Sequence, residues 1–237
     1  MSTRVIPGRR NSEWRLSLAP GMTSTIGIIG SGNIGSALAR AFTAAGHAVV
    51  IANSRGPASL APLVAELGDL ATAGTVEQAA QAGDLVVVTI PLKAVESIPS
   101  DLLDGRTVID TNNYYPARDG HIAELDDEIL TTSEFVARHF AGATVVKAFN
   151  HIPALAIADQ AQPSGTTDRR ALMVYGEDAA AVERVSALID VIGFDAVNGG
   201  GLAESWRIQR DNPAYGPRFT AAELAVKLAE ARRYRDQ

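Results

Sequence analysis

Residues 26–35 read Ile-Gly-Ile-Ile-Gly-Ser-Gly-Asn-Ile-Gly, and this stretch decides the fold. A short apolar run, typical of a buried strand, leads into glycines at positions 30, 32 and 35. Gly30 suits a tight turn, Gly32 lets backbone N–H groups approach an anion, and Gly35 lets a helix pack closely on the strand. A strand, a glycine turn and a helix start in this order predict binding of a dinucleotide pyrophosphate.

The flanking sequence supports this interpretation over an ordinary glycine-rich corner between a strand and a helix. Apolar residues recur at helical spacing after the turn, at Ala37, Leu38, Ala41, Phe42 and Ala45. A second apolar run at residues 48–52 then completes a β–α–β unit. The helix start adds unpaired N–H donors and a partial positive charge that favour an anion.

The end of the second predicted strand indicates which dinucleotide binds. An NAD site usually has an acidic residue there that accepts from the ribose 2′-OH, but no Asp or Glu lies between Ile29 and Glu66. The strand instead ends in Asn53-Ser54-Arg55. A guanidinium pairs with a 2′-phosphate and a hydroxyl donates to it, so we expect NADP(H) to be preferred. The alternative is that Arg55 is an ordinary solvated loop arginine.

Strands and helices alternate along most of the chain, which predicts an α/β fold with a doubly wound, mostly parallel sheet, the Rossmann fold. The most apolar predicted strand, residues 85–90, suits a central position buried on both faces. We expect an N-terminal extension (residues 1–22), a Rossmann NADP-binding domain (23–200) and a C-terminal helical segment (201–237). The helical segment is interrupted at residues 213–217, and Thr220 is expected to cap the last helix. Polar residues 118–128 are expected to form a solvated loop.

Composition narrows the class of protein. The 237 residues include no cysteine, which excludes disulfides and thiolate metal sites and fits a cytoplasmic location. The net charge of −6 argues against nonspecific binding to nucleic acid or membranes, and no apolar run is long enough to span a bilayer. His121 and His139 show no metal-ligand spacing, so we expect no metal site.

Four short motifs together resemble the F420-dependent NADP reductases. They are the glycine turn, Asn-Ser-Arg after strand two, Thr-Ile-Pro at 89–91 and Phe-Asn-His-Ile-Pro-Ala at 149–154. The resemblance spans residues 25–204, and the same domain type is similar to the reductase part of ferric-reductase membrane proteins. It implies a homodimer that transfers hydride between NADP(H) and a deazaflavin (F420) or flavin. Polar residues 206–213 replace an expected apolar segment, which leaves the acceptor open.

The resemblance also implies roles for individual residues. Ser31, Asn33 and Ile34 would face the pyrophosphate, and Ser54 and Arg55 would hold the 2′-phosphate. Ile90 and Pro91 would lie near the nicotinamide, and residues 150–153 would border the acceptor pocket. The full set expected to bind the cofactor is Gly30, Ser31, Gly32, Asn33, Ile34, Gly35, Asn53, Ser54, Arg55, Ile90, Pro91 and Asn112.

Hydride transfer between two aligned heterocycles needs few side chains, because the cofactor carries the reactivity. Asn150 and His151 are the candidate catalytic residues; His151 could contact the acceptor or transfer a proton, or only order its loop through backbone hydrogen bonds. Asn112 could bind a ribose or carboxamide, or simply form a turn. Two other functions stay open: reduction of a small carbonyl or imine, with His151 or a tyrosine as proton donor, and a non-catalytic NADPH sensor.

Overall fold

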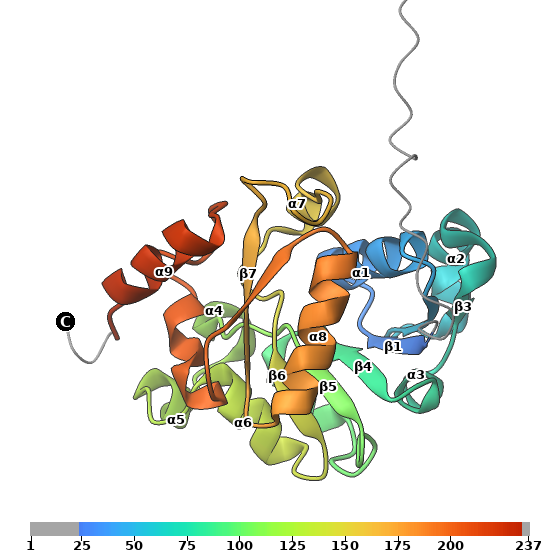
Figure 1. Cartoon of the computed structure of the whole chain (residues 1–237). Coiled ribbons are helices and arrows are strands. Elements are labelled where there is room, and N and C mark those ends of the chain that lie inside the picture. Colours follow the sequence, from blue (N-terminus) through green and yellow to red (C-terminus); the bar gives the residue numbers. More distant parts are fainter. Residues whose placement is uncertain (1–23, 234–237) are drawn as a thin grey trace, which may run out of the picture.

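The computed structural model describes residues 24–233, which form an eight-stranded sheet in the order β3-β2-β1-β4-β5-β6-β7-β8 (Figure 1). The predicted extension, residues 1–22, lies outside the described residues. The strands are β1 (Thr25–Ile29), β2 (Ala48–Ala52), β3 (Ala71–Ala73), β4 (Leu85–Val88), β5 (Thr107–Asp110), β6 (Thr144–Lys147), β7 (Ala171–Gly176) and β8 (Asp195–Asn198).

Helices connect these strands and cover both faces of the sheet (Figure 1). The α-helices are α1 (Asn33–Ala44), α2 (Ala61–Leu67), α3 (Val76–Gln81), α4 (Pro116–Asp119), α5 (Ala123–Asp126), α6 (Thr132–His139), α7 (Ala154–Asp159), α8 (Ala179–Val191) and α9 (Ala221–Glu230). The 3₁₀ helices are η1 (Pro57–Leu60), η2 (Gly68–Leu70), η3 (Leu92–Ser97) and η4 (Leu202–Ile208). Within residues 24–233, none of these helices has the length and apolar character that a bilayer span requires.

The strand order changes direction between β1 and β4, and in sheets of this kind a crevice is expected at the carboxyl ends of the strands at that point. Strands β1 to β6 are parallel, β7 is antiparallel to β6, and β8 is parallel to β7. After β1 the chain builds β2 and β3 on one side and then crosses to β4 on the other. The loops that follow β1 and β4 therefore diverge, and ligands of such sheets bind where they separate. The predicted fold, a doubly wound and mostly parallel sheet, is confirmed.

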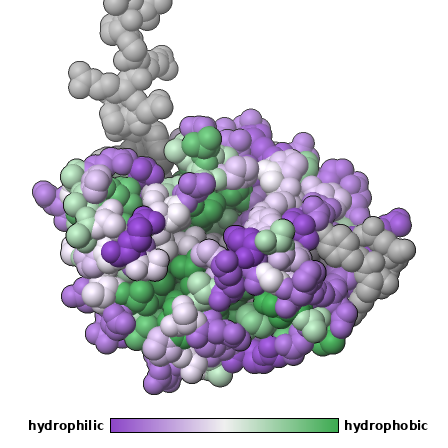
Figure 2. Space-filling model, turned by 180° about the vertical axis from the view of Figure 1, so that it is seen from behind, coloured by the Kyte–Doolittle hydropathy of each residue, from purple (hydrophilic) through white to green (hydrophobic). Residues whose placement is uncertain are grey.

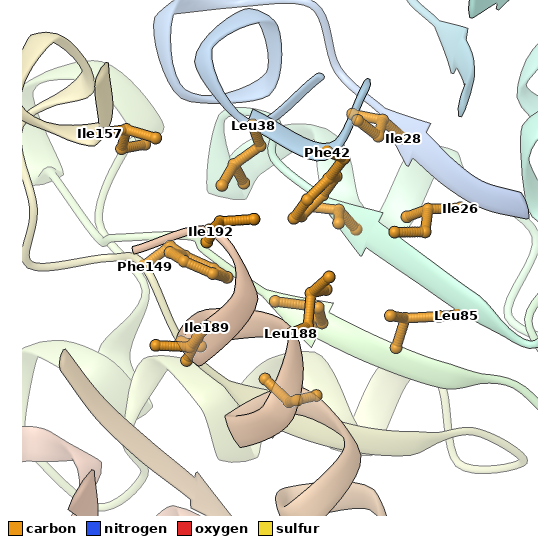
Figure 3. Packing of buried hydrophobic residues seen from close by; sticks show 14 of the residues in the cluster. Ile26, Ile28, Leu38, Phe42, Leu85, Phe149, Ile157, Leu188, Ile189 and Ile192 are labelled. Carbon is orange, nitrogen blue, oxygen red and sulfur yellow. The ribbon is translucent and has the colours of Figure 1, made fainter. Parts of the chain in front are cut away.

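Two hydrophobic clusters, one on each face, hold the sheet in place. Successive strand residues point to opposite faces, so Val87 belongs to one cluster and Val86 to the other. On the first face, Phe42 of α1 packs near Leu188 of α8 and near Ile192, which directly follows α8 (Figure 3). The second face is covered by α3, α6, η3 and the C-terminal elements. Burial on both faces explains why the central strands are continuous apolar runs.

The structure differs from the sequence prediction in short elements. Residues 118–128, expected to be a solvated loop, include parts of α4 and all of α5. Helix α7 was not expected either. Helices α4, α5 and α7 have only four to six residues, which is too short for apolar residues to recur at helical spacing in the sequence. The cap of α9 is as predicted, because the Thr220 hydroxyl accepts from the backbone N–H of Glu223 in a capping box.

Candidate dinucleotide site

The glycine turn after β1 combines one strained position, one open position and one tightly packed position. Gly30 has a φ of +117°, and a Cβ atom there would lie 2.1 Å from the carbonyl oxygen of Thr89. A Cβ on Gly35 would lie 2.0 Å from the carbonyl oxygen of Gly30. A Cβ on Gly32, in contrast, would meet no atom within 4 Å. The turn and packing roles expected of Gly30 and Gly35 agree with this geometry, and Gly32 borders open space that a ligand can enter.

The start of α1 presents donors to that space. Gly32 is the N-cap residue, no side chain caps the helix, and its first turn contains no acidic residue. Asn33 is exposed and Ile34 is half-buried at this end. The first N–H groups of a helix lack partners within the helix and carry a partial positive charge. This end of α1 can therefore bind an anion such as a pyrophosphate.

The loop after β2 is tied to the glycine turn through Asn53. Its side-chain nitrogen donates to the Ser31 hydroxyl at 2.9 Å, and its side-chain oxygen accepts from the Arg55 backbone N–H at 2.8 Å. The same amide also bonds Ser59, which the sequence analysis did not single out. Because the Ser31 oxygen accepts from Asn53, the hydroxyl proton of Ser31 is free to point to a ligand. Asn53 thus fixes the distance between two parts of the site.

The side chains of Ser54 and Arg55 project from this loop into solvent. Both residues are exposed, and the Arg55 guanidinium has no hydrogen-bond or ion-pair partner within the described part of the chain. The neighbouring Arg40 of α1, by comparison, makes a bidentate ion pair with Glu66 at 2.6 and 2.8 Å. An unpaired guanidinium beside an anion-binding helix start is suited to a second phosphate group.

The loops after β4 and β5 form the other side of the crevice. The Ile90 backbone N–H donates to the side-chain oxygen of Asn112 at 3.1 Å, so the two predicted site residues are in contact. Ile90 is half-buried and Pro91 is exposed, whereas Asn112 is only 3% exposed. Asn112 therefore lies beneath the rim of the crevice.

A buried ion pair, which the sequence analysis missed, supports Asn112 from below. Lys147 of β6 donates to the Asp110 carboxylate at 3.0 Å and also to the Asn112 carbonyl oxygen, and both charged side chains are fully buried. The other oxygen of Asp110 accepts from the Asn112 backbone N–H at 2.8 Å, and Ser133 donates to the carboxylate. Burial lowers the pKa of Lys147, and Asp110 opposes that shift. The sequence did contain a signal for this pair: Asp110 and Lys147 are charged residues, and each ends an otherwise apolar predicted strand.

Asn150 and His151 follow β6 and are both buried. Phe149 precedes them with a φ of +61°, a strained backbone conformation for a bulky residue. The Asn150 side-chain nitrogen donates to the carbonyl oxygen of Ile208 at 2.9 Å and to the Asn113 side-chain oxygen at 3.2 Å. Strained backbone of this kind is concentrated at functional sites.

His151 has the backbone-bonded arrangement that was the alternative to a catalytic role. It is 2% exposed, and its ring Nε2 accepts from the Met173 backbone N–H at 3.2 Å. Burial, together with the cations Arg170 and Lys147, lowers the pKa of His151 to about 3. The ring is therefore neutral near pH 7 and is occupied in holding its loop against β7.

The C-terminal segment closes over this side of the crevice. The Tyr215 hydroxyl lies 2.5 Å from that of Tyr115, and Asn113 donates to it at 3.3 Å. Arg170, buried at the start of β7, donates to the carbonyl oxygens of His151, Gly216 and Pro217. Neither Tyr215 nor Arg170 was identified from the sequence, because their side-chain partners lie 10 to 102 residues away.

A separate cavity of about 240 Å³ lies at the opposite edge of the sheet, where β1 and β4 begin. Its lining includes Ser24, Ile26, His47, Leu85 and Leu188, all remote from the loops that follow the strands. The uncapped start of α1 and the unpaired Arg55 guanidinium, in contrast, lie at the carboxyl ends of the strands, next to the glycine turn.

The fold and this edge of the sheet define a Rossmann-type dinucleotide-binding protein. Residues 25–114 match the family described as NADP oxidoreductase, coenzyme F420-dependent. A hypothetical protein from Sinorhizobium meliloti is 36% identical, and its crystal structure aligns with a TM-score of 0.72 over 84% of this chain and 95% of that one. The chain belongs to this F420-dependent NADP oxidoreductase family, which confirms the resemblance and the predicted class of enzyme.

Two more distant proteins are similar over most of the chain. Metalloreductase STEAP3 from Rattus norvegicus is 28% identical over 201 residues, which cover 84% of this chain but only 38% of STEAP3. The structure of a proposed F420-dependent NADP reductase from Arthrobacter sp. FB24 has 23% identity and a TM-score of 0.63, over 78% of this chain and 87% of that one. At this identity the second similarity shows the shared fold alone.

Proposed function

We propose that this protein transfers hydride between NADPH and a planar heterocyclic acceptor, a deazaflavin or a flavin. The observation that carries the proposal is the unpaired Arg55 guanidinium beside the uncapped start of α1, with no acidic residue between Ile29 and Glu66. That arrangement favours a dinucleotide with a 2′-phosphate. Family membership and the metalloreductase STEAP3 support an oxidoreductase.

The residues present fit NADPH at the glycine turn and at the loop after β2. Backbone N–H groups at Ser31, Asn33 and Ile34 would bind the pyrophosphate, and Ser54 and Arg55 would bind the 2′-phosphate. Bound NADPH would supply the hydride. Ile90, Pro91 and Asn112 would orient its nicotinamide, and residues 150–153 would border the acceptor. The protein's contribution is position and exclusion of water.

The residues that would border the acceptor include no strong proton donor, which favours a heterocyclic acceptor over a carbonyl substrate. Reduction of a carbonyl or imine needs a proton donor beside the substrate. His151 cannot act as one near neutral pH, because it is buried, neutral and hydrogen-bonded to the backbone. Burial and the hydrogen bond to Tyr115 also raise the pKa of Tyr215, which makes that hydroxyl a weaker acid.

A second candidate function, reduction of a small carbonyl or imine, rests on the Tyr115–Tyr215 pair. Two part-buried hydroxyls 2.5 Å apart at the mouth of the crevice could pass one proton to a substrate. This reaction would show a solvent deuterium isotope effect and a large loss of kcat in Tyr215→Phe. Hydride transfer to a deazaflavin would be far less sensitive to that substitution.

The direct test mixes the purified protein anaerobically with NADPH and oxidised F420, with FMN in a parallel arm. We expect loss of the NADPH absorbance and bleaching of one acceptor at matching rates. Tight NADPH binding with both acceptors unchanged would contradict the proposal. In that case the carbonyl reductase or a non-catalytic NADPH sensor would have to be tested next.

We also propose a homodimer in the cytoplasm, as the resemblance implies. Large hydrophobic side chains are exposed at Leu70, Ile129, Leu155 and Val226, and hydrophobic residues reach the surface on the face shown in Figure 2. Exposed apolar surface is common at subunit interfaces. Light scattering on the eluting protein should give twice the 24.9 kDa chain mass.

A further inference from the structure

The buried side-chain amides of Asn112, after β5, and Asn150, after β6, each have one polar atom without a hydrogen-bond partner among the described residues. The side-chain nitrogen of Asn112 and the side-chain oxygen of Asn150 are out of contact with solvent and have no hydrogen-bond partner in the region spanning residues 24–233. The two residues are 3% and 4% exposed. A buried polar group without a partner costs about 1–3 kcal/mol, so both atoms call for a partner that binds there.

The backbone partners of the two amides establish which atom is unpaired. The Asn112 oxygen accepts from the Ile90 N–H, which leaves the nitrogen, a donor, unpaired. The Asn150 nitrogen donates to the Ile208 carbonyl oxygen, which leaves the oxygen, an acceptor, unpaired. Rotating either amide by 180° would place like groups against each other. The two amides therefore offer one donor and one acceptor, and Nδ1 of the adjacent His151 is a further buried atom without a partner among residues 24–233.

Asn113 links the loop that carries Asn112 to the loop that carries Asn150. It follows Asn112 directly, its side-chain nitrogen donates to the Asn150 carbonyl oxygen at 2.8 Å, and its oxygen accepts from the Asn150 side chain at 3.2 Å. Asp110 and Lys147 fix the backbone of Asn112 from both sides. A donor and an acceptor held in this way are preorganised for a ligand that carries the complementary pair.

We infer that Asn112 and Asn150 together bind an amide edge, a C=O group beside an N–H group. The C=O would accept from Asn112, and the N–H would donate to Asn150. This inference rests on the proposed function, within which two groups have that chemistry: the carboxamide of NADPH, and the pyrimidinedione edge of a flavin or deazaflavin. Asn112 follows β5 and Asn150 follows β6, so the amide edge would reach both side chains at the carboxyl ends of these neighbouring strands.

Wild-type protein can be tested first, with ligand analogues that lack the N–H. Reduced 3-acetylpyridine adenine dinucleotide phosphate replaces the carboxamide of NADPH by a methyl ketone, and N3-methyl-FMN blocks the N–H of the flavin. If the amide edge is the carboxamide, the first analogue should bind roughly tenfold more weakly than NADPH. If it belongs to the acceptor, N3-methyl-FMN should instead have a roughly tenfold higher KM than FMN.

Substitution then tests the contact of Asn112 with the C=O group, which the analogues retain. Asn112→Asp keeps an oxygen for the Ile90 N–H but replaces the unpaired donor with an acceptor, so it should weaken binding of the ligand and of its analogue alike, by roughly tenfold. The matched control is Thr111→Val, which removes a buried hydroxyl bonded to Val88 in the same loop and should leave both affinities unchanged.

Three outcomes separate this inference from the proposed function. Discrimination in the wild type, together with weaker binding of both members of that ligand pair in Asn112→Asp, supports the amide site. Equal affinity for both members of each ligand pair would overturn it, and the unpaired atoms would then be assigned to buried water. Failure to bind adenosine 2′,5′-bisphosphate, which lacks the nicotinamide half, would overturn the NADP site itself and with it the premise of the amide site.

Discussion

The two sides of the crevice are built in opposite ways. On the glycine-turn side, the residues that would hold the cofactor are exposed or border open space, and Asn53 joins loops only 22 residues apart in sequence. On the side of β5 and β6, the polar groups are buried, and their partners are 37, 58 and 102 residues away. We call these the exposed side and the buried side.

This difference suits the two sides to different tasks in ligand binding. The exposed side can bind phosphate groups with backbone donors and an arginine that reaches into solvent, and it needs little tertiary support. The polar groups of the buried side are fixed by an ion pair and by the C-terminal segment, which suits the proposed task of holding a planar ring in one orientation. Substitutions of the exposed side chains on the first side should therefore affect binding alone, whereas substitutions on the second side should affect stability together with binding.

The largest effect on the exposed side should come from Gly30, where that side meets the sheet. Gly30→Ala would place a methyl group 2.1 Å from the Thr89 carbonyl oxygen at a φ of +117°, and it should destabilise the protein by about 3 kcal/mol or more. Urea unfolding measures this loss. Gly32→Ala is the matched control: it meets no atom, so stability should be unchanged while NADPH affinity falls. Equal destabilisation by both substitutions would refute the assigned geometry.

Lys147 tests the buried side. Lys147→Met leaves the Asp110 carboxylate buried without its cation, and the expected loss of unfolding free energy is about 3–5 kcal/mol. The double variant Asp110→Asn/Lys147→Met removes both charges and should recover part of that loss. Chemical denaturation of the three proteins measures the coupling. If the single substitution cost less than the double, the pair would not be the stabilising element proposed.

The same contrast explains what could be predicted from the sequence. Local patterns identified the glycine turn, the strands and the Thr220 cap, because each depends on residues within a few positions of one another. Asp110 and Lys147 were missed, since nothing in either segment indicates that β5 and β6 are neighbours. The burial of His151 depends on β7 running antiparallel beside β6, which no local pattern specifies.

Arg55 tests the exposed side by binding alone. Arg55→Ala should weaken NADPH binding by about 1.5–3 kcal/mol, the range for charge-assisted hydrogen bonds, and should leave NADH binding and stability unchanged. Titration calorimetry with both dinucleotides measures the difference. Arg40→Ala is a suitable control, because that arginine is already paired with Glu66 and should not affect either ligand. Equal losses for NADPH and NADH would mean that Arg55 does not contact the 2′-phosphate.

A further prediction is a pH dependence of stability that comes from the buried side. His151 has a pKa of about 3 in the folded protein, against 6.5 for a freely solvated histidine, so the unfolded chain binds a proton that the folded protein does not. Stability should therefore be complete above about pH 6.5 and should fall as the pH drops towards 3, by up to about 1.4 kcal/mol per pH unit. Wild type and His151→Gln, which keeps an acceptor for the Met173 N–H, should be compared by urea unfolding across that window. Carboxylates titrate in both proteins and cancel in the difference, so a wild-type slope no steeper than that of His151→Gln would show that His151 is protonated in the folded state.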